Sequence, residues 1–131
     1  MKNVLIALVA FASSASAQAS FLGKIGPYLE GAPQEARLSF EPCVQAPVTM
    51  KFHSEQSRAH HVPRIRPDRL TVVYGSGAEE SWDGTSLGTV KAFTLRADRG
   101  DDCVKEVVMR ASAAGFEPSG VNTVYLTVWR Q

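Results

Sequence analysis

The stretch TVYLTVW, residues 123–129, alternates in side-chain character with a period of two. Successive side chains of a β-strand point to opposite sides, so an alternating segment is typical of a strand with one buried face. The expected buried side holds Val124, Leu126 and Val128, and the expected outward side holds Thr123, Tyr125, Thr127 and Trp129. The segment therefore predicts a half-buried β-strand.

The same period of two recurs in earlier segments. Candidate strands lie at residues 36–40, 48–53, 70–74, 89–96 and 104–111, and clusters of Gly, Pro, Asp or Ser separate them. No segment shows a helical period over more than a turn or two. Short strands separated by turn residues predict an all-β fold: a single small antiparallel β-sandwich, immunoglobulin-like or pilin-like, with a barrel as the alternative.

The first residues, MKNVLIALVAFASSASA, have the three parts of a secretory signal peptide. Lys2 supplies the positive charge, residues 4–12 form an apolar run, and Ala15-Ser16-Ala17 provides the small residues that a signal peptidase accepts. The apolar run is too short to span about 30 Å of hydrocarbon. We expect cleavage after this triplet, with Ala19 as the alternative site and a short membrane anchor as the alternative role.

Removal of residues 1–17 leaves 114 of the 131 residues, a length that corresponds to one domain with a small core. We expect an N-terminal arm or first strand at 18–30 and the β-sandwich domain at 31–131. Lys2 leaves with the signal peptide, so 13 basic residues face 13 acidic ones. This balance predicts no nucleic-acid partner. We also expect no transmembrane segment in the mature chain, and a location in the periplasm of a Gram-negative-type envelope or at the cell surface.

Cys43 and Cys103 are the two cysteines of the chain. An even number of cysteines in an exported protein predicts a disulfide. The bridge would close a loop of about 60 residues, which stabilises the folded state by roughly 4 kcal/mol in the chain-entropy model. We place Cys43 just before the strand at 48–53 and Cys103 at the start of the strand at 104–111. Two free thiols at a redox or metal site are the alternative.

An Arg-Gly-Asp triplet, Arg99, Gly100 and Asp101, lies between two predicted strands. We expect a hairpin connection here, with a positive φ at Gly100 and solvated acids at the tip. Such a tip would also be able to present Arg99 and Asp101 to a receptor carboxylate and a receptor metal ion, as in integrin binding. Trp82 lies in a second candidate contact loop, GSGAEESWDGTSLG at residues 75–88. It is either a contact residue or a plug that packs back on the sheet.

Three histidines, His53, His60 and His61, form the candidate metal site, because neutral imidazoles bind copper and zinc. The stretch APQEARLSFEPCVQAPVTMKF, residues 32–52, resembles the opening strands of periplasmic copper carriers of the CopC type. The resemblance implies copper binding. Those carriers place a histidine at the mature N-terminus, whereas this chain has Gln18-Ala19-Ser20 there. Surface histidines without a metal are the alternative.

The segment QASFLGKIGPYLEG, residues 18–31, places Phe21, Gly23 and Ile25 on one side if it is extended. An arm with alternating apolar residues around a glycine, joined to a small β-sandwich, is similar to chaperone–usher pilus subunits. The resemblance implies that the arm of one subunit completes the sheet of its neighbour. Those subunits usually have an aromatic residue next to last, where this chain has Arg130. The alternative is a first strand within a self-contained domain.

Motifs of catalysis do not stand out in the sequence. The chain lacks H-E-x-x-H, G-x-S-x-G and a Gly-rich phosphate loop, so we expect neither an enzyme nor a cofactor. We expect an exported binding or adhesion module, of which a pilin-like fibre subunit is one form. Its partner would be a protein: a host receptor, a neighbouring subunit or a periplasmic protein. A periplasmic copper- or zinc-binding protein and a small secreted enzyme inhibitor are the alternatives.

Overall fold

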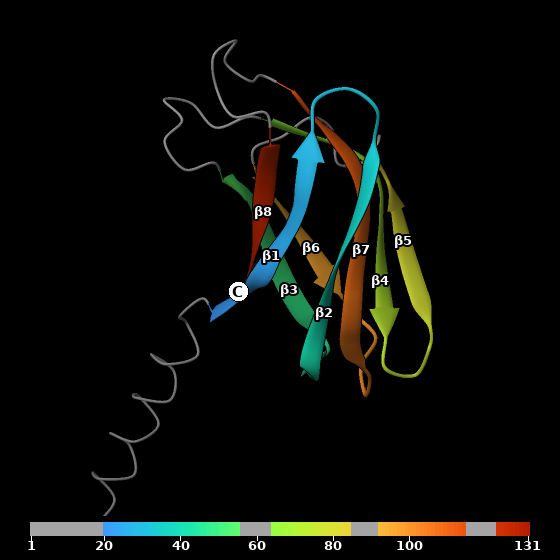
Figure 1. Cartoon of the computed structure of the whole chain (residues 1–131). Coiled ribbons are helices and arrows are strands. Elements are labelled where there is room, and N and C mark those ends of the chain that lie inside the picture. The colour runs from blue at the N-terminus through green and yellow to red at the C-terminus, as the bar shows by residue number, and fades with distance from the viewer. Residues whose placement is uncertain (1–19, 56–63, 85–91, 115–122) are drawn as a thin grey trace, which may run out of the picture.

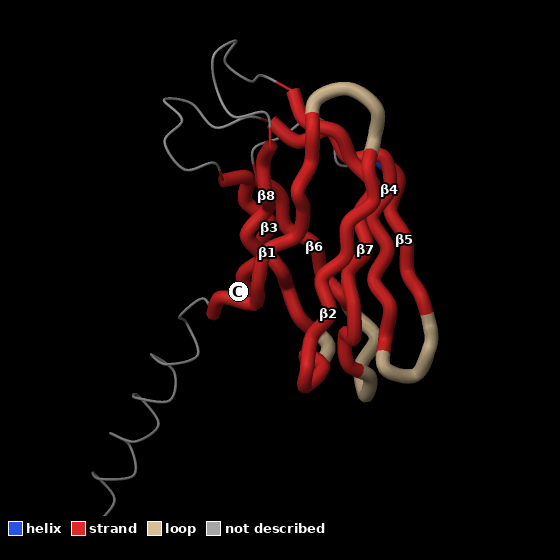
Figure 2. Tube along the Cα trace, viewed as in Figure 1, coloured by secondary structure: helices blue, strands red, loops and turns tan. Residues whose placement is uncertain are grey.

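The computed structural model describes residues 20–55, 64–84, 92–114 and 123–131. These residues form eight strands: β1 (Ser20–Leu29), β2 (Gln34–Gln45), β3 (Val48–Glu55), β4 (Arg64–Tyr74), β5 (Glu79–Asp83), β6 (Ala92–Ala97), β7 (Cys103–Ala114) and β8 (Thr123–Arg130). Figure 2 shows that strands make up almost all of the described chain. No helix in the described ranges is long and apolar enough to cross a bilayer.

The strands form two four-stranded sheets that pack face to face (Figure 1). Sheet A has the order β1-β8-β3-β6, and sheet B has the order β2-β7-β4-β5. All pairings between these strands are antiparallel. The predicted antiparallel β-sandwich with one disulfide is therefore confirmed. The first and last strands of the chain lie side by side in sheet A.

Alternate side chains of both sheets fill the space between them. In β3, Met50 and Phe52 are fully buried while Lys51 is exposed. The ring of Phe52 stacks on that of Phe93 in β6, with 4.7 Å between the ring centroids. The expected inward residues of β7 and β8 are also fully buried: Val107, Met109, Ala111, Val124, Leu126 and Val128. The period of two thus predicts correctly which side of these strands faces the core.

Strand β5 lies where the sequence predicts a long contact loop. Its residues pair with β4, from Val73↔Glu79 to Arg69↔Asp83. A tight turn joins the two strands, in which the Gly77 amide donates to the carbonyl of Tyr74 at 2.9 Å. The loop prediction for residues 75–88 is therefore wrong at Glu79–Asp83, which form a strand, whereas residues 75–78 are a turn. Residues 85–91 lie outside the described chain.

A register shift in β1 separates Phe21 from the side of the strand on which it was expected. The pairing with β8 runs from Phe21↔Trp129 directly to Gly23↔Val128, which leaves Leu22 as an extra residue. Gly23 has a φ of +152°, and a Cβ there would lie 2.8 Å from a methyl carbon of Leu38. The prediction that Phe21, Gly23 and Ile25 share one side is wrong: Ile25 is fully buried, whereas Phe21 is 53% exposed.

The predicted disulfide joins Cys43 and Cys103, whose Cα atoms are 5.5 Å apart. Cys43 lies within β2 rather than just before β3, and Cys103 begins β7. These strands are neighbours in sheet B, and their register shifts between Ser39 and Val44. The covalent bond therefore holds β2 and β7 together where their regular pairing is interrupted.

A buried hydrogen bond connects the two sheets. The hydroxyl of Tyr28, in β1 of sheet A, donates to the carbonyl of Met109, in β7 of sheet B, at 2.9 Å. Burial raises the pKa of Tyr28, and the nearby carboxylate of Glu35 raises it further. The hydroxyl therefore stays protonated and acts as a donor.

Replacing both Cys43 and Cys103 with Ala should lower the free energy of unfolding by roughly 4 kcal/mol. The bridge joins residues 60 positions apart, and without it the unfolded chain regains the conformational entropy that closing this loop removes. Urea unfolding of the oxidised protein and of the double variant measures this difference. A reducing agent should destabilise the natural chain by a similar amount and leave the double variant unchanged. Equal stability of all four samples would contradict a stabilising bridge.

Replacing Tyr28 with Phe should cost about 1 kcal/mol, the net value of one buried hydrogen bond. Tyr125, which is 40% exposed in β8, provides the matched control: its change to Phe should alter stability by less than about 0.5 kcal/mol. Thermal unfolding followed by circular dichroism compares the two. An equal effect of both changes would show that the contact between the sheets contributes nothing.

Candidate functional site

The Arg-Gly-Asp triplet lies in the connection between β6 and β7, residues 98–102. Strand β6 belongs to sheet A and β7 to sheet B, so the connection crosses between sheets and the predicted hairpin is wrong. The positive φ expected at Gly100 is found at Asp101 instead, with a φ of 65°. Aspartate is one of the few side chains that adopt this left-handed conformation readily.

Arg99 is held against the body of the protein. Its Nε donates to Oδ2 of Asp102 at 3.3 Å, and its guanidinium carbon lies 5.8 Å from the ring centroid of Tyr74. Its carbonyl accepts a hydrogen bond from the Asp102 amide at 3.3 Å. These contacts orient the side chain of Arg99, although that side chain is exposed, as is Asp101. Receptor binding by the triplet stays a prediction.

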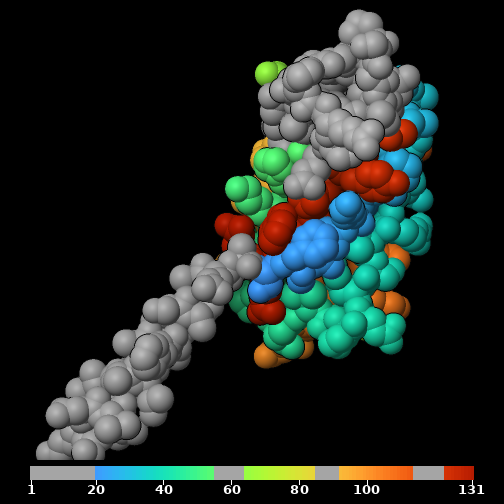
Figure 3. Space-filling model, turned by 60° about the vertical axis from the view of Figure 1, so that its left-hand side comes forward, coloured from blue at the N-terminus to red at the C-terminus, as the bar shows by residue number. Residues whose placement is uncertain are grey.

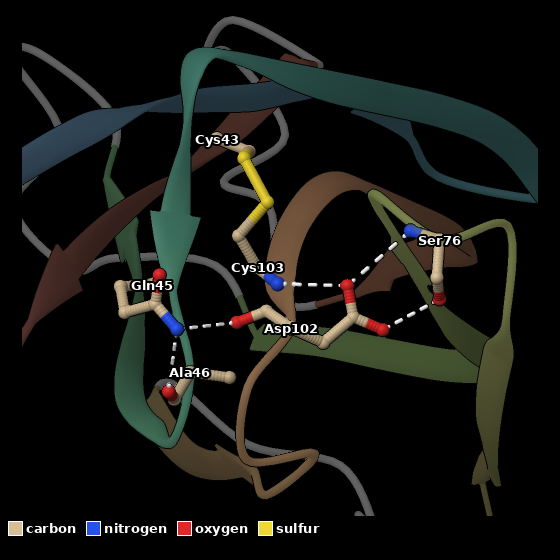
Figure 4. Close-up of a disulfide and its surroundings, with 6 residues drawn as sticks. All are labelled: Cys43, Gln45, Ala46, Ser76, Asp102 and Cys103. Atoms are coloured by element: carbon tan, nitrogen blue, oxygen red, sulfur yellow. Dashed lines mark hydrogen bonds between the residues drawn. A yellow bond between two sulfur atoms is a disulfide. The ribbon is translucent and has the colours of Figure 1, made fainter.

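Asp102, directly after the triplet, contacts three connections at this end of the sandwich (Figure 4). Its Oδ1 accepts from the amides of Cys103 at 2.9 Å and Ser76 at 3.2 Å, and its Oδ2 accepts from the Ser76 hydroxyl at 2.5 Å. Its carbonyl accepts from the Ala46 amide at 2.9 Å and from Nε2 of Gln45 at 2.8 Å. The β2–β3, β4–β5 and β6–β7 connections therefore meet at one residue beside the disulfide.

The electrostatics around Asp102 are explained by this structural role. The hydroxyl of Ser76, followed by the amides, holds the pKa of the Asp102 carboxyl below its usual 3.8, against the opposing effect of partial burial. Nearby, burial and a 2.6 Å hydrogen bond to Glu80 raise the pKa of Tyr74 to about 12. A charged carboxylate and a protonated phenol suit the hydrogen bonds that they make, so the cluster needs no ligand to account for it.

Trp82, the second predicted contact residue, lies in β5 opposite Leu70 of β4. Its side chain is half-buried and packs against the core. Leu70 is fully buried, so the shared inward direction places the indole at the edge of the core. This position favours the plug over the contact residue.

The three candidate metal ligands are not brought together within the described chain. His53 lies in β3, opposite Thr127 of β8 and Ala92 of β6, and its side chain is half-buried. His60 and His61 lie outside the described residues. Within residues 20–55, 64–84, 92–114 and 123–131, no group of three or more His, Cys, Asp or Glu side chains is placed to hold a metal ion.

The exposed large apolar side chains of the described residues gather on one pair of strands. Phe21 is 53% exposed, Leu29 39% and Tyr125 40%, and all three belong to β1 or β8. The ring of Phe21 packs edge-on against Trp129, with 5.1 Å between the centroids. Figure 3 shows β1 and β8 residues side by side on this surface. We call the outward residues Phe21, Lys24, Leu29, Tyr125 and Trp129 the aromatic face.

Local contacts orient the rings of the aromatic face. A Cβ at Gly26 would lie 3.0 Å from a ring carbon of Tyr125, so the glycine leaves room for that ring. The ammonium of Lys24 is 5.9 Å from the centroid of the same ring. Nε1 of Trp129 donates to Oγ1 of Thr127 at 3.1 Å, which fixes the indole on the sheet.

The sequence alone does not group the residues of the aromatic face. It predicts Tyr125 and Trp129 on the outward side of their strand, but it places Phe21 with Ile25. The inserted Leu22 and the pairing of the first strand with the last decide the grouping, and neither leaves a local pattern. The signal available from the sequence is the pair of aromatic residues, Tyr125 and Trp129, at outward positions of the last strand.

Replacing Asp102 with Asn should lower stability at neutral pH and have a smaller effect in acid. A carboxyl whose folded-state pKa is lowered contributes stability above its unfolded pKa of about 3.9 and loses it as the pH falls through the folded value. Urea midpoints of both proteins, compared from about pH 7 down to about pH 2, should therefore converge below about pH 4.

Asp101 provides the matched control for this change. It is the neighbouring, exposed aspartate, and asparagine also adopts its left-handed conformation. Replacing Asp101 with Asn should leave the urea midpoint unchanged at every pH. A difference between the Asp102 variant and the natural chain that is independent of pH would contradict a role for the charge.

No family model, curated protein or solved structure matches this chain. Function therefore has to be inferred from the residues themselves. The contacts of Asp102 and Arg99 are explained by the joining of three connections. The exposed rings of Phe21 and Tyr125 are not explained by the packing of the core, and they make the aromatic face the candidate functional site.

Proposed function

We propose that this protein is an exported, non-enzymatic binding module whose contact surface is the aromatic face of sheet A. The observation that carries the proposal is the gathering of Phe21, Leu29 and Tyr125 on two adjacent strands. Large apolar side chains that are exposed together mark interaction sites, whereas single scattered ones do not. Burying the exposed half of Phe21 in a complex would contribute roughly 1 kcal/mol.

Two features support export. The first 17 residues have the charge, the apolar run and the small residues of a signal peptide. The bridge between Cys43 and Cys103 is of the kind that persists in oxidising compartments, such as the periplasm or the cell exterior. A small domain with this bridge is suited to work at either location.

The pairing of β1 with β8 supports a self-contained module over a pilin-like fibre subunit. In a fibre, the arm of one subunit would complete the sheet of its neighbour. Here β1 fills that position beside β8 of its own chain, from Ser20↔Arg130 to Leu29↔Thr123. Two of its side chains, Ile25 and Tyr28, are fully buried. An exchange between subunits would first have to withdraw both from the core.

Site-specific photo-crosslinking in living cells tests the binding surface. A photoreactive phenylalanine analogue in place of Phe21 should form adducts with an envelope component, because this ring is the most exposed of the aromatic face. The adducts are detected by gel shift and identified by mass spectrometry.

The same analogue in place of Arg37 is the matched control. Arg37 is exposed on the outward side of sheet B, so its position should give few adducts. Equal adducts from both positions, or neither a protein nor a lipid adduct from the position of Phe21, would contradict the proposed contact surface.

A further inference from the structure

The two sheets differ in charge. The four strands of sheet A contain four Lys or Arg residues and one acidic residue, Glu55. The four strands of sheet B contain six Lys or Arg residues and seven acidic ones. Sheet A therefore carries a net positive charge, although the mature chain as a whole is balanced.

The basic residues of sheet A lie beside the aromatic face. Lys24 belongs to it, and Lys51 of β3 is directly opposite Trp129. Both lysines are exposed, and the ion pairs found within the described residues include neither of them. Arg96 of β6, in contrast, lies 3.6 Å from Asp98. Lys24 and Lys51, like the exposed Arg130 of β8, are therefore cations of sheet A without an ion pair among the described residues.

None of the exposed large apolar side chains of the described residues lies on sheet B, where six basic residues are offset by seven acidic ones. There Arg37 lies 3.4 Å from Glu35 and from Glu106, and Arg110 lies 3.2 Å from Asp68. Charges that are paired within the protein offer little net attraction to an external ion. Exposed basic residues such as Lys105 also occur on sheet B, so the exposed rings beside the lysines are what distinguish sheet A.

A second copy of the chain is a poor partner for the aromatic face. A two-fold pair would bring the same surface of both molecules together. Lys24 and Lys51 would then face the lysines of the other copy, and like charges across an interface oppose association. The charge of this surface calls for a partner that is negative.

The combination of side chains matches the interface of an anionic bilayer. Trp and Tyr rings favour the headgroup level of a membrane, and lysines gain from the potential of anionic lipids. The face follows β1 from Phe21 to Leu29, a length of about 26 Å at the rise of a strand.

We infer that the partner in the proposed binding function is an anionic lipid surface. Phe21, Tyr125 and Trp129 enter the headgroup region, and Lys24 and Lys51 contact the lipid phosphates. The inference rests on the proposed function but is narrower, because that function would also be met by a protein partner. Binding of this kind depends on lipid charge, weakens with salt and uses one face of the sandwich.

Vesicle flotation tests the inference on the purified protein. Vesicles of phosphatidylcholine with phosphatidylglycerol should carry the protein at low salt, and vesicles of phosphatidylcholine alone should not. Lys24→Gln and Lys51→Gln should each weaken binding about fivefold, which corresponds to about 1 kcal/mol per basic residue near an anionic surface. Phe21→Ser should also weaken it about fivefold, through lost apolar burial.

Lys105→Gln is the matched control, because Lys105 is an exposed lysine of β7 in sheet B. This variant should bind as tightly as the natural chain, and circular dichroism should show all four variants folded. Equal binding to both kinds of vesicle, or an equal loss in the Lys105 variant, would overturn the inference.

Two further outcomes separate this inference from the proposed function. Protein adducts from the position of Phe21 without any vesicle binding would overturn the lipid partner but would still support the proposed function as a binding module. In the second outcome, the protein binds no vesicles but is retained on dextran sulfate equally well with and without Phe21→Ser. That result would indicate that the lysines bind a soluble polyanion, and it would overturn the lipid partner. Neither adducts nor vesicle binding would overturn both.

Discussion

The space between the two sheets has to be filled by side chains from alternate positions of the strands, and most of the structure depends on this packing constraint. It buries Met50 and Phe52 from sheet A against Met109 and other apolar residues from sheet B. It also brings the hydroxyl of Tyr28 to a carbonyl of the opposite sheet. Because the inward positions meet the needs of the core, the outward positions are left to carry charge and exposed rings.

The alternating pattern explains how much of the fold the sequence predicts. A period of two reports which side of a strand is buried, and it does so correctly for β3, β7 and β8. It does not report which strands are neighbours, so it predicts a hairpin where the chain crosses between sheets. It also fails where the alternation is absent: β5 is largely acidic, and the extra Leu22 interrupts the pattern in β1.

The candidate site is less predictable because it depends on contacts between distant parts of the chain. The disulfide can be predicted from the number of cysteines alone, whereas the conformation of the Arg-Gly-Asp segment cannot be predicted from its three residues. Asp102, outside the triplet, makes the contacts that shape that segment. The aromatic face likewise combines Phe21 with Trp129, which only the pairing of the first and last strands brings together. Short motifs therefore say less about this surface than the topology does.

The position of β8 in the middle of sheet A has a consequence for biogenesis. No two neighbouring strands of that sheet follow each other in the sequence, and a chain still under synthesis lacks the segment that joins β1 to β3. Such long-range pairing is slow to form, and sheet A can be completed only after β8 has been synthesised. We propose that this chain is exported. Late completion of sheet A would then help the polypeptide to pass a narrow translocation channel before it folds.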